Sequence, residues 1–199
     1  MRVDNEMSNN EKEVLEIGFS ENFTKEEIKE IIETFSTIVR SEPRYYVKLS
    51  AEELPAELIF ILGCIFGSVA SGFFSSMGSD LYQKAKEKVI RILKNKKDPT
   101  LEFKMSYKNT EIIISSKTKD EQELNKIFDT INKAREIAIA ELDKKDTPEM
   151  TEVKIVYDDE KWVPDSGRCW KPLGKPRIIR FYKYDKSAGK WKLIEDWSE

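Results

Sequence analysis

One uncharged stretch of 22 residues, Leu58 to Ser79, constrains this chain more than any other feature. It reads LIFILGCIFGSVASGFFSSMGS and interrupts a chain in which 36% of the residues are charged. About 20 apolar residues suffice for a helix to cross a bilayer, and a helix that is apolar on every side is either a membrane span or the centre of a large core. The stretch therefore predicts a long apolar helix that lipid, a partner chain or the protein's own core must cover.

Small residues in this stretch recur at steps of four, which places them on one face of the predicted helix. Such a face lets a second helix approach closely, as in the association of membrane helices. The more ordinary interpretation is that it lets a buried helix lie flat on a sheet or on a neighbouring helix. The residues expected at this helix-packing or oligomer interface are Gly63, Gly67, Ser71, Gly72 and Ser75.

The charge of the chain is unevenly distributed, although its net value is small. A net charge of −3 and a pI near 5.4 give no overall attraction to nucleic acid or membrane. Residues 1–57 carry 14 acidic and seven basic side chains, whereas residues 168–192 carry nine basic side chains and one acid, Asp185. This asymmetry predicts a local basic surface near the C-terminus.

The missing residue types exclude several kinds of active site. The chain has no histidine, so a Ser-His-Asp or Cys-His site is impossible and the commonest metal ligand is lacking. Cys64 and Cys169 imply no disulfide framework, and the first residues lack the apolar core of a signal peptide. We therefore expect a non-enzymatic cytoplasmic protein without a cofactor, with attachment to the inner face of the membrane as an open alternative.

Apolar periodicity and capping signals predict alternating strands and helices. Thr24 with Glu27 forms a capping box before a helix with an apolar stripe, and Ser50 with Glu53 is expected to cap the apolar helix. Thr118 is expected to cap the last helix. The other predicted elements are strands at 14–20, 44–49, 101–107, 111–116 and 152–157, a basic amphipathic helix at 80–96 and a helix that follows Thr118 and ends at about 144.

This order of elements predicts an α+β fold of the ferredoxin-like or split βαβ type, with the apolar helix and the basic amphipathic helix inserted. The first strand-helix-strand segment is too short to form its own core, so it needs the later strands as sheet partners. A single membrane span at 58–79 would separate those strands, so a buried or interfacial helix is favoured over a span. The expected domains are a flexible tail at 1–13, an α+β domain at 14–146 with a helical insertion at 51–97, and a small β-rich unit at 151–199.

The segment after residue 162 combines turn, aromatic and basic residues. Turns are expected at 163–167 and 171–174, and strands at 177–184 and 190–197. Basic side chains contact phosphates and aromatic faces stack on bases, so the pattern admits single-stranded nucleic acid or another anionic ligand. The alternative is an ordinary hairpin with an aromatic core. The candidate ligand-binding residues are Arg168, Lys171, Lys175, Arg177, Arg180, Lys183 and Trp191.

Two Glu-x-Lys triplets, Glu102 with Lys104 and Glu152 with Lys154, resemble the pairs that metal-dependent nucleases use. Alternating charge is expected by chance in so charged a chain, so we expect no metal site here. The leading hypothesis is an assembly or binding module that associates with itself, a partner protein or the membrane surface through the small-residue face of helix 58–79. Nucleic-acid binding near the C-terminus is the alternative, and a nuclease is the least favoured function.

Overall fold

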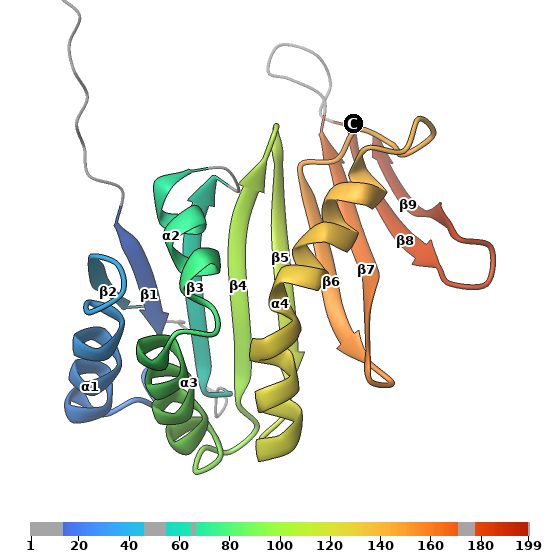
Figure 1. Ribbon diagram of the computed structural model, residues 1–199. Coiled ribbons are helices and arrows are strands. Elements are labelled where there is room, and N and C mark those ends of the chain that lie inside the picture. The colour runs from blue at the N-terminus through green and yellow to red at the C-terminus, as the bar shows by residue number, and fades with distance from the viewer. Residues whose placement is uncertain (1–13, 46–54, 65–66, 171–177, 199) are drawn as a thin grey trace, which may run out of the picture.

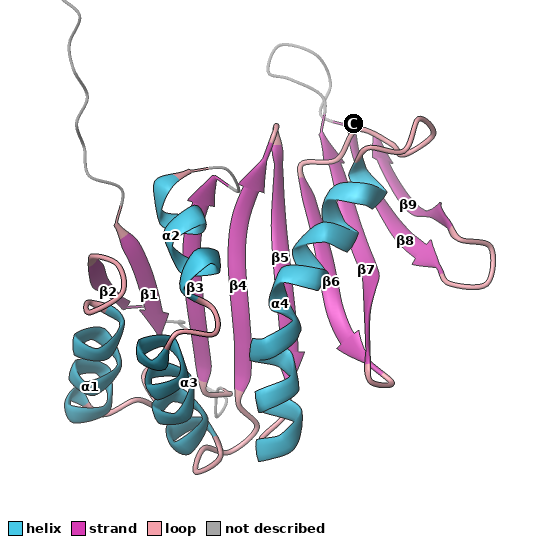
Figure 2. Cartoon of the chain, in the orientation of Figure 1, coloured by secondary structure: helices cyan, strands magenta, loops and turns pink. Residues whose placement is uncertain are grey.

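The chain folds around one wide mixed β-sheet (Figure 1). The computed structural model describes residues 14–45, 55–64, 67–170 and 178–198. Within these ranges nine strands form a single sheet, and four helices lie against one of its faces (Figures 1 and 2). The predicted α+β class is therefore confirmed, whereas the predicted tail at 1–13 and the cap at Ser50 and Glu53 lie outside the described residues.

The sheet has the order β2-β1-β3-β4-β5-β6-β7-β8-β9, so its neighbours follow the chain closely. Three parallel pairs, β1–β2, β3–β4 and β5–β6, are joined through helices, and the remaining pairs are antiparallel. The elements are β1 (Leu15–Phe19), α1 (Lys25–Phe35), β2 (Ser41–Tyr45), β3 (Glu57–Cys64), α2 (Ser68–Ser76), α3 (Asp80–Leu93), β4 (Thr100–Tyr107), β5 (Thr110–Lys117), α4 (Glu121–Leu142), β6 (Glu152–Asp158), β7 (Lys161–Trp170), β8 (Ile178–Asp185) and β9 (Lys190–Ser198).

The predicted split βαβ arrangement is not the one that the chain forms. In a split unit another strand lies between the two strands that the helix joins. Here β1 pairs directly with β2, β3 with β4, and β5 with β6. Each crossover therefore connects adjacent parallel strands.

The crossover through α4 has the opposite hand to the other two. The crossovers from β3 to β4 and from β5 to β6 both move in the same direction across the sheet, and their helices cover the same face. The strands of the second unit, however, run antiparallel to those of the first, so the two crossovers have opposite hands. Figure 1 shows that β5–α4–β6 is the left-handed unit, although about 98% of such crossovers are right-handed. A right-handed path would move α4 to the other face, away from the aromatic core.

This core is a cluster of aromatic rings between the sheet and the helices. Phe60 of β3 stacks on Phe103 of β4 with ring centroids 5.0 Å apart, and Phe73 of α2 and Phe128 of α4 contact both rings. The Tyr82 hydroxyl of α3 donates a hydrogen bond of 3.2 Å to the main-chain carbonyl of Phe128. Burial raises the pKa of the Tyr82 phenol above its usual value, so this donor stays protonated. One cluster thus joins two strands to three helices.

The prediction of one apolar helix over 58–79 is wrong. Glu57–Cys64 is the strand β3, and only Ser68–Ser76 within the remainder is a described helix. Leu58 and Phe60 are fully buried towards the helices, while Ile59 on the other side is only 5% exposed. A strand buried on both faces has no polar alternation, so its sequence looks the same as that of a buried helix. Gly63 then adopts a φ of +64°, a conformation that glycine allows, near the end of the strand.

Other local predictions fared differently. The capping box at Thr24 and Glu27 is confirmed, because each side chain bonds the main-chain N–H of the other. The cap at Thr118 is wrong, because Asp120 begins α4 by accepting a hydrogen bond of 2.8 Å from the N–H of Glu123. Aspartate is as good an N-cap as serine or threonine, so spacing alone could not choose between the two positions.

The predicted turn at 163–167 is also wrong, since these residues belong to β7. The pairing with β6 shifts between Pro164 and Ser166, so the chain makes a bulge in place of a turn. A Cβ on Gly167 would lie 2.3 Å from Sδ of Met150, so glycine lets that side chain pack against the strand. The predicted turn at 171–174 lies outside the described residues.

Candidate functional site

The two faces of the sheet differ in what covers them. The four helices pack on one face, and no described helix or strand covers the other, which we call the open face. In β4, for example, Leu101 and Phe103 are buried towards the helices, whereas Glu102 and Lys104 on the open face are partly exposed. Within the described ranges, the surface of the open face is therefore formed by strand side chains.

The open face carries an aromatic-basic patch where β7, β8 and β9 pair. Phe181 lies at its centre, with the Arg168 guanidinium 5.3 Å from its ring centroid and the Trp197 ring edge-on at 6.3 Å. Trp170 and Trp197 are 43% and 62% exposed. The residues of the patch are Arg168, Trp170, Ile179, Phe181, Lys183, Lys192 and Trp197, with the Glu195 carboxylate beside Phe181 accepting a hydrogen bond from Trp197.

Two cations of this patch are not neutralised by an ion pair among the described residues. Lys183 is exposed and has no carboxylate within salt-bridge distance. Arg168 has a buried Nε without a hydrogen-bond partner in the described part of the chain. Because this Nε is itself buried, an added acceptor such as a phosphate oxygen would bind the other nitrogens of the guanidinium.

Neighbouring charges of β8 and β9 are already paired. The Nε atom of Arg180 donates to Asp196 at 3.1 Å on the side of the sheet that faces the helices. Lys192 contacts Asp185 at 2.5 Å, and hydrogen bonds from Lys192 and Ser187 hold the pKa of Asp185 well below its usual range. These ion pairs brace the β8–β9 hairpin and leave Arg180 less free to bind a ligand than Arg168.

The structure brings together only part of the predicted anionic-ligand set. Arg168 and Lys183 share the open face, whereas Arg180 lies on the other side of β8. Trp191 also lies on that other side, with its ring 5.3 Å from Tyr184. The predicted residues Lys171, Lys175 and Arg177 lie outside the described ranges.

The predicted ligand-binding set lacks several members of this patch, namely Trp170, Ile179, Phe181, Lys192 and Trp197. The signal was present, because alternate residues of a strand share a face, and Ile179, Phe181 and Lys183 alternate along β8. The sequence prediction did not assign the aromatic residues to the two faces of the strands. It therefore included Trp191, which lies on the opposite face from the patch.

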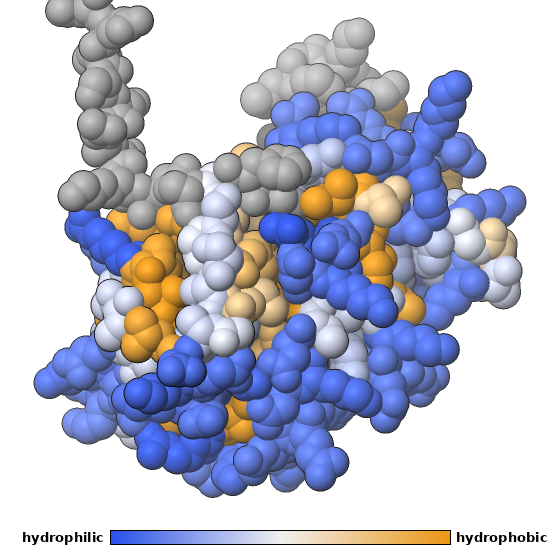
Figure 3. Space-filling model, viewed as in Figure 1, coloured by the Kyte–Doolittle hydropathy of each residue, from blue (hydrophilic) through white to orange (hydrophobic). Residues whose placement is uncertain are grey.

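The predicted small-residue interface does not form one ridge. Gly63 belongs to a strand, and Gly67 precedes the first residue of α2. Ser71 and Ser75 are exposed on that short helix and Gly72 is half-buried. Figure 3 shows a pale strip in the region of α2, with apolar surface on both sides of it. No helix in the described ranges has the length and apolarity to cross a membrane.

The Glu-x-Lys residues of β4 form a polar cluster on the open face. Glu102 is contacted by Lys104 and Lys154, both at 3.8 Å, and it accepts a hydrogen bond of 3.4 Å from Ser115. Its neighbours are therefore cations and a hydroxyl, and the described residues contain no group of three acidic, cysteine or histidine side chains that could hold a metal ion. This donor set does not fit a divalent cation.

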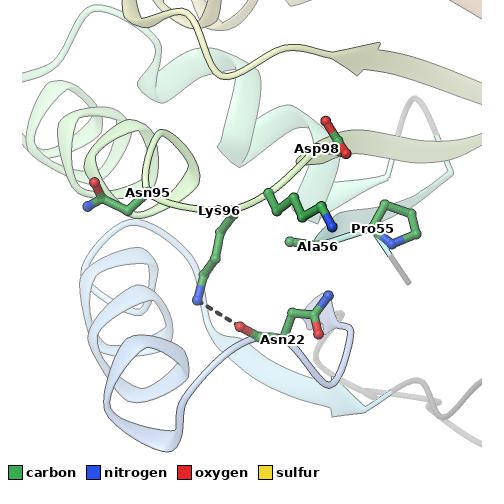
Figure 4. A pocket seen from close by; sticks show the side chains of 7 residues that line it. Asn22, Pro55, Ala56, Asn95, Lys96 and Asp98 are labelled. Carbon is green, nitrogen blue, oxygen red and sulfur yellow. Dashed lines mark hydrogen bonds between the residues drawn. The ribbon is translucent and has the colours of Figure 1, made fainter. Parts of the chain in front are cut away.

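A pocket of about 510 Å³ lies at the end of the sheet where β3 and β4 begin (Figure 4). Lys96 enters it, but its ammonium donates to the Asn22 carbonyl at 2.7 Å and to Glu27 at 2.6 Å. The same ammonium lies 4.9 Å from the ring centroid of Phe23. This lysine ties the turn after α3 to the start of α1, so its charge is already satisfied.

Comparisons of the chain with protein-family models, with curated proteins and with solved structures gave no match.

Proposed function

We propose that the protein is a binding module whose aromatic-basic patch takes single-stranded nucleic acid. The observation that carries the proposal is the exposed aromatic surface of Trp170 and Trp197 beside Arg168 and Lys183, which form no ion pair among the described residues. An antiparallel sheet that presents aromatic rings on an open face is a recurrent platform for unpaired bases.

Each kind of residue in the patch has a separate role in this proposal. Trp197 and Trp170 offer ring faces on which bases stack, and stacking tolerates any sequence because every base has a π-face. Arg168 and Lys183 supply the positive charge that holds phosphates. Binding should therefore depend on salt but only weakly on base sequence.

Self-association through a helix at 58–79, which we hypothesised from the sequence, has lost the helix on which it rested. Phe73, one of the two phenylalanines of α2, is fully buried in the protein's own core. The open face is therefore the better-supported binding surface. A non-catalytic role agrees with the donor set around Glu102 and remains part of the proposal.

The test is fluorescence anisotropy of a labelled oligothymidylate titrated with the full-length protein at several salt concentrations. Trp197→Ala is expected to weaken binding by roughly 5- to 150-fold, the range that loss of one stacked base gives. Arg168→Ala and Lys183→Ala should each lower the slope of log affinity against log salt by about 1.

Matched controls come from the face that the helices cover. Trp191→Phe changes an aromatic residue on that face, and Lys133→Ala removes an exposed cation from α4. Both controls should bind like the unaltered protein, and a duplex of the same sequence should compete poorly because its bases are not free to stack. Absence of binding at low salt, or equal effects of patch and control variants, would refute the proposal.

A further inference from the structure

The last strand of the sheet has an outer edge that no described strand pairs with. The strand β9 is nine residues long, and it exposes 48% of Leu193 and 57% of Ile194. Edge strands present a row of unpaired N–H and C=O groups, which is a template for another strand. In native proteins, a long apolar edge of this kind is normally either protected from pairing or used to bind another strand.

The strand at the opposite edge of the sheet, β2, has features that protect it from pairing with a further strand. The strand β2 has only five residues and contains Pro43, which cannot donate to a further strand. Its charged residues are paired, Glu42 with Arg40 and Arg44 with Glu16, but Lys192 and Asp196 of β9 are paired as well, so the two edges differ in length and in proline. In contrast, β9 contains no proline or glycine, and its one irregularity is the shift in pairing around Ile194.

The charges of β9 are ordered along the strand. Lys190 and Lys192 precede the exposed apolar pair Leu193–Ile194, and Glu195 and Asp196 follow it. Antiparallel pairing of two copies places the basic half of each strand opposite the acidic half of the other, with the apolar pairs in the middle. Parallel pairing would set like charges opposite one another, which is destabilising.

From this charge order we propose that β9 pairs antiparallel with β9 of a second copy of the chain. The register sets Lys192 opposite Glu195 of the second copy, twice over by symmetry, so the Lys192 ammonium, which contacts Asp185 of its own chain, lies between two carboxylates. The two residues fit because both lie on the open-face side, Lys192 opposite Lys183 and Glu195 opposite Phe181 of β8. The two sheets then become one, and their aromatic-basic patches become neighbours on a single surface.

Pairing through one edge buries a small area, so the dimer is weak. Interfaces below the standard size are typical of transient association, and we expect a dissociation constant on the order of 10 to 100 µM. Sedimentation equilibrium of the full chain over about 1 to 300 µM covers that range. The unaltered protein should move from monomer to dimer across it and stop there.

Two single charge reversals test the register. In Glu195→Lys and in Lys192→Glu, both ion pairs of the homodimer become like-charge pairs, so each variant alone should dimerise at least about tenfold more weakly. An equimolar mixture of the two variants should recover association, because every opposed pair is again a cation and a carboxylate. Glu111→Lys on β5, an interior strand, is the matched control and should dimerise normally.

Each alternative outcome overturns the proposal. A monomeric unaltered protein at the highest concentration removes the dimer itself. Dimers that persist unchanged in both variants place the interface elsewhere. Variants that are folded by circular dichroism and weakened, but that do not recover on mixing, show that charge complementarity between the two edges is not what joins them.

Discussion

The two halves of the sheet are stabilised in different ways. The strands β1 to β6 lie under helices and bury an aromatic core in which Phe60, Phe73, Phe103 and Phe128 are at most 1% exposed. The strands β8 and β9 leave Leu193, Ile194 and Trp197 about half exposed or more. Apolar surface contributes to folding only when it leaves water, so these exposed residues add little to stability.

At the exposed end of the sheet, polar contacts contribute a larger share of the stabilisation. Asp196 binds Arg180, Asp185 binds Lys192, and Asp158 binds Lys186 across the β6–β7 and β8–β9 turns. Exposed ion pairs of this kind contribute at most about 1 kcal/mol each. The comparison indicates that the covered half determines the stability of the fold, whereas the exposed half keeps apolar and charged groups available for binding.

The largest effect expected from this comparison is on the aromatic core. Phe60→Ala should lower the free energy of unfolding by about 3 to 5 kcal/mol, because it removes a ring that contacts four others and leaves a cavity. Phe181→Ala, the same change at the exposed end, should cost clearly less because Phe181 is only half-buried. Urea denaturation followed by circular dichroism measures both, and equal losses would contradict the division of the sheet.

A smaller effect is expected from the hydroxyl groups of two tyrosines. Tyr82→Phe should cost about 1 to 2 kcal/mol, since the buried Tyr82 hydroxyl bonds the Phe128 carbonyl. The hydroxyl of Tyr182 in β8 has no hydrogen bond within the described residues, so Tyr182→Phe should leave the free energy of unfolding almost unchanged. A loss at Tyr182 as large as that at Tyr82 would show that the exposed end is braced more strongly than its contacts indicate.

Much of the secondary structure follows from local sequence signals. The capping box at Thr24 and the alternation of Leu15, Ile17 and Phe19 place α1 and β1 correctly, because both signals act within a few residues. The hairpin β4–β5 was likewise predicted at its observed position, with Lys108 at a positive φ in the turn. Such features depend little on the rest of the chain.

The failed predictions concern residues whose structure depends on distant partners. Leu58 to Leu62 becomes a strand because β1 and β4 pair with it on either side, and nothing within the five residues reveals those partners. Similarly, Pro164 and Gly167 fit a strand only because a bulge and the Met150 side chain accommodate them. The prediction of the candidate site included the wrong tryptophan for the same reason. The bulge in β9 determines which of Trp191 and Trp197 lies on the open face.

Helix caps allow a finer test within the covered half. Thr24→Ala should lower the free energy of unfolding by about 1 kcal/mol, because it removes the acceptor for the Glu27 N–H at the start of α1. Thr24→Ser keeps a hydroxyl and should recover most of the loss. Thermal unfolding of the three proteins measures the difference, and equal melting temperatures for Thr24→Ala and the unaltered chain would show that this cap is redundant.

The smallest expected effect is a local pH dependence at the exposed end. The Asp185 carboxylate accepts hydrogen bonds from the N–H groups of Ser187 and Ala188 and contacts the Lys192 ammonium, which lowers the pKa of Asp185 from its usual value near 3.8. Since the folded pKa is depressed, the stabilisation is complete above the unfolded value and is lost as the pH falls below about 4. Amide exchange at Ser187 and Ala188, corrected for its intrinsic pH dependence, should therefore lose protection in acid while β4 and β5 stay protected. Asp185→Asn should abolish that pH dependence, and protection that persists in acid would mean that the β8–β9 turn is held by its backbone rather than by this carboxylate.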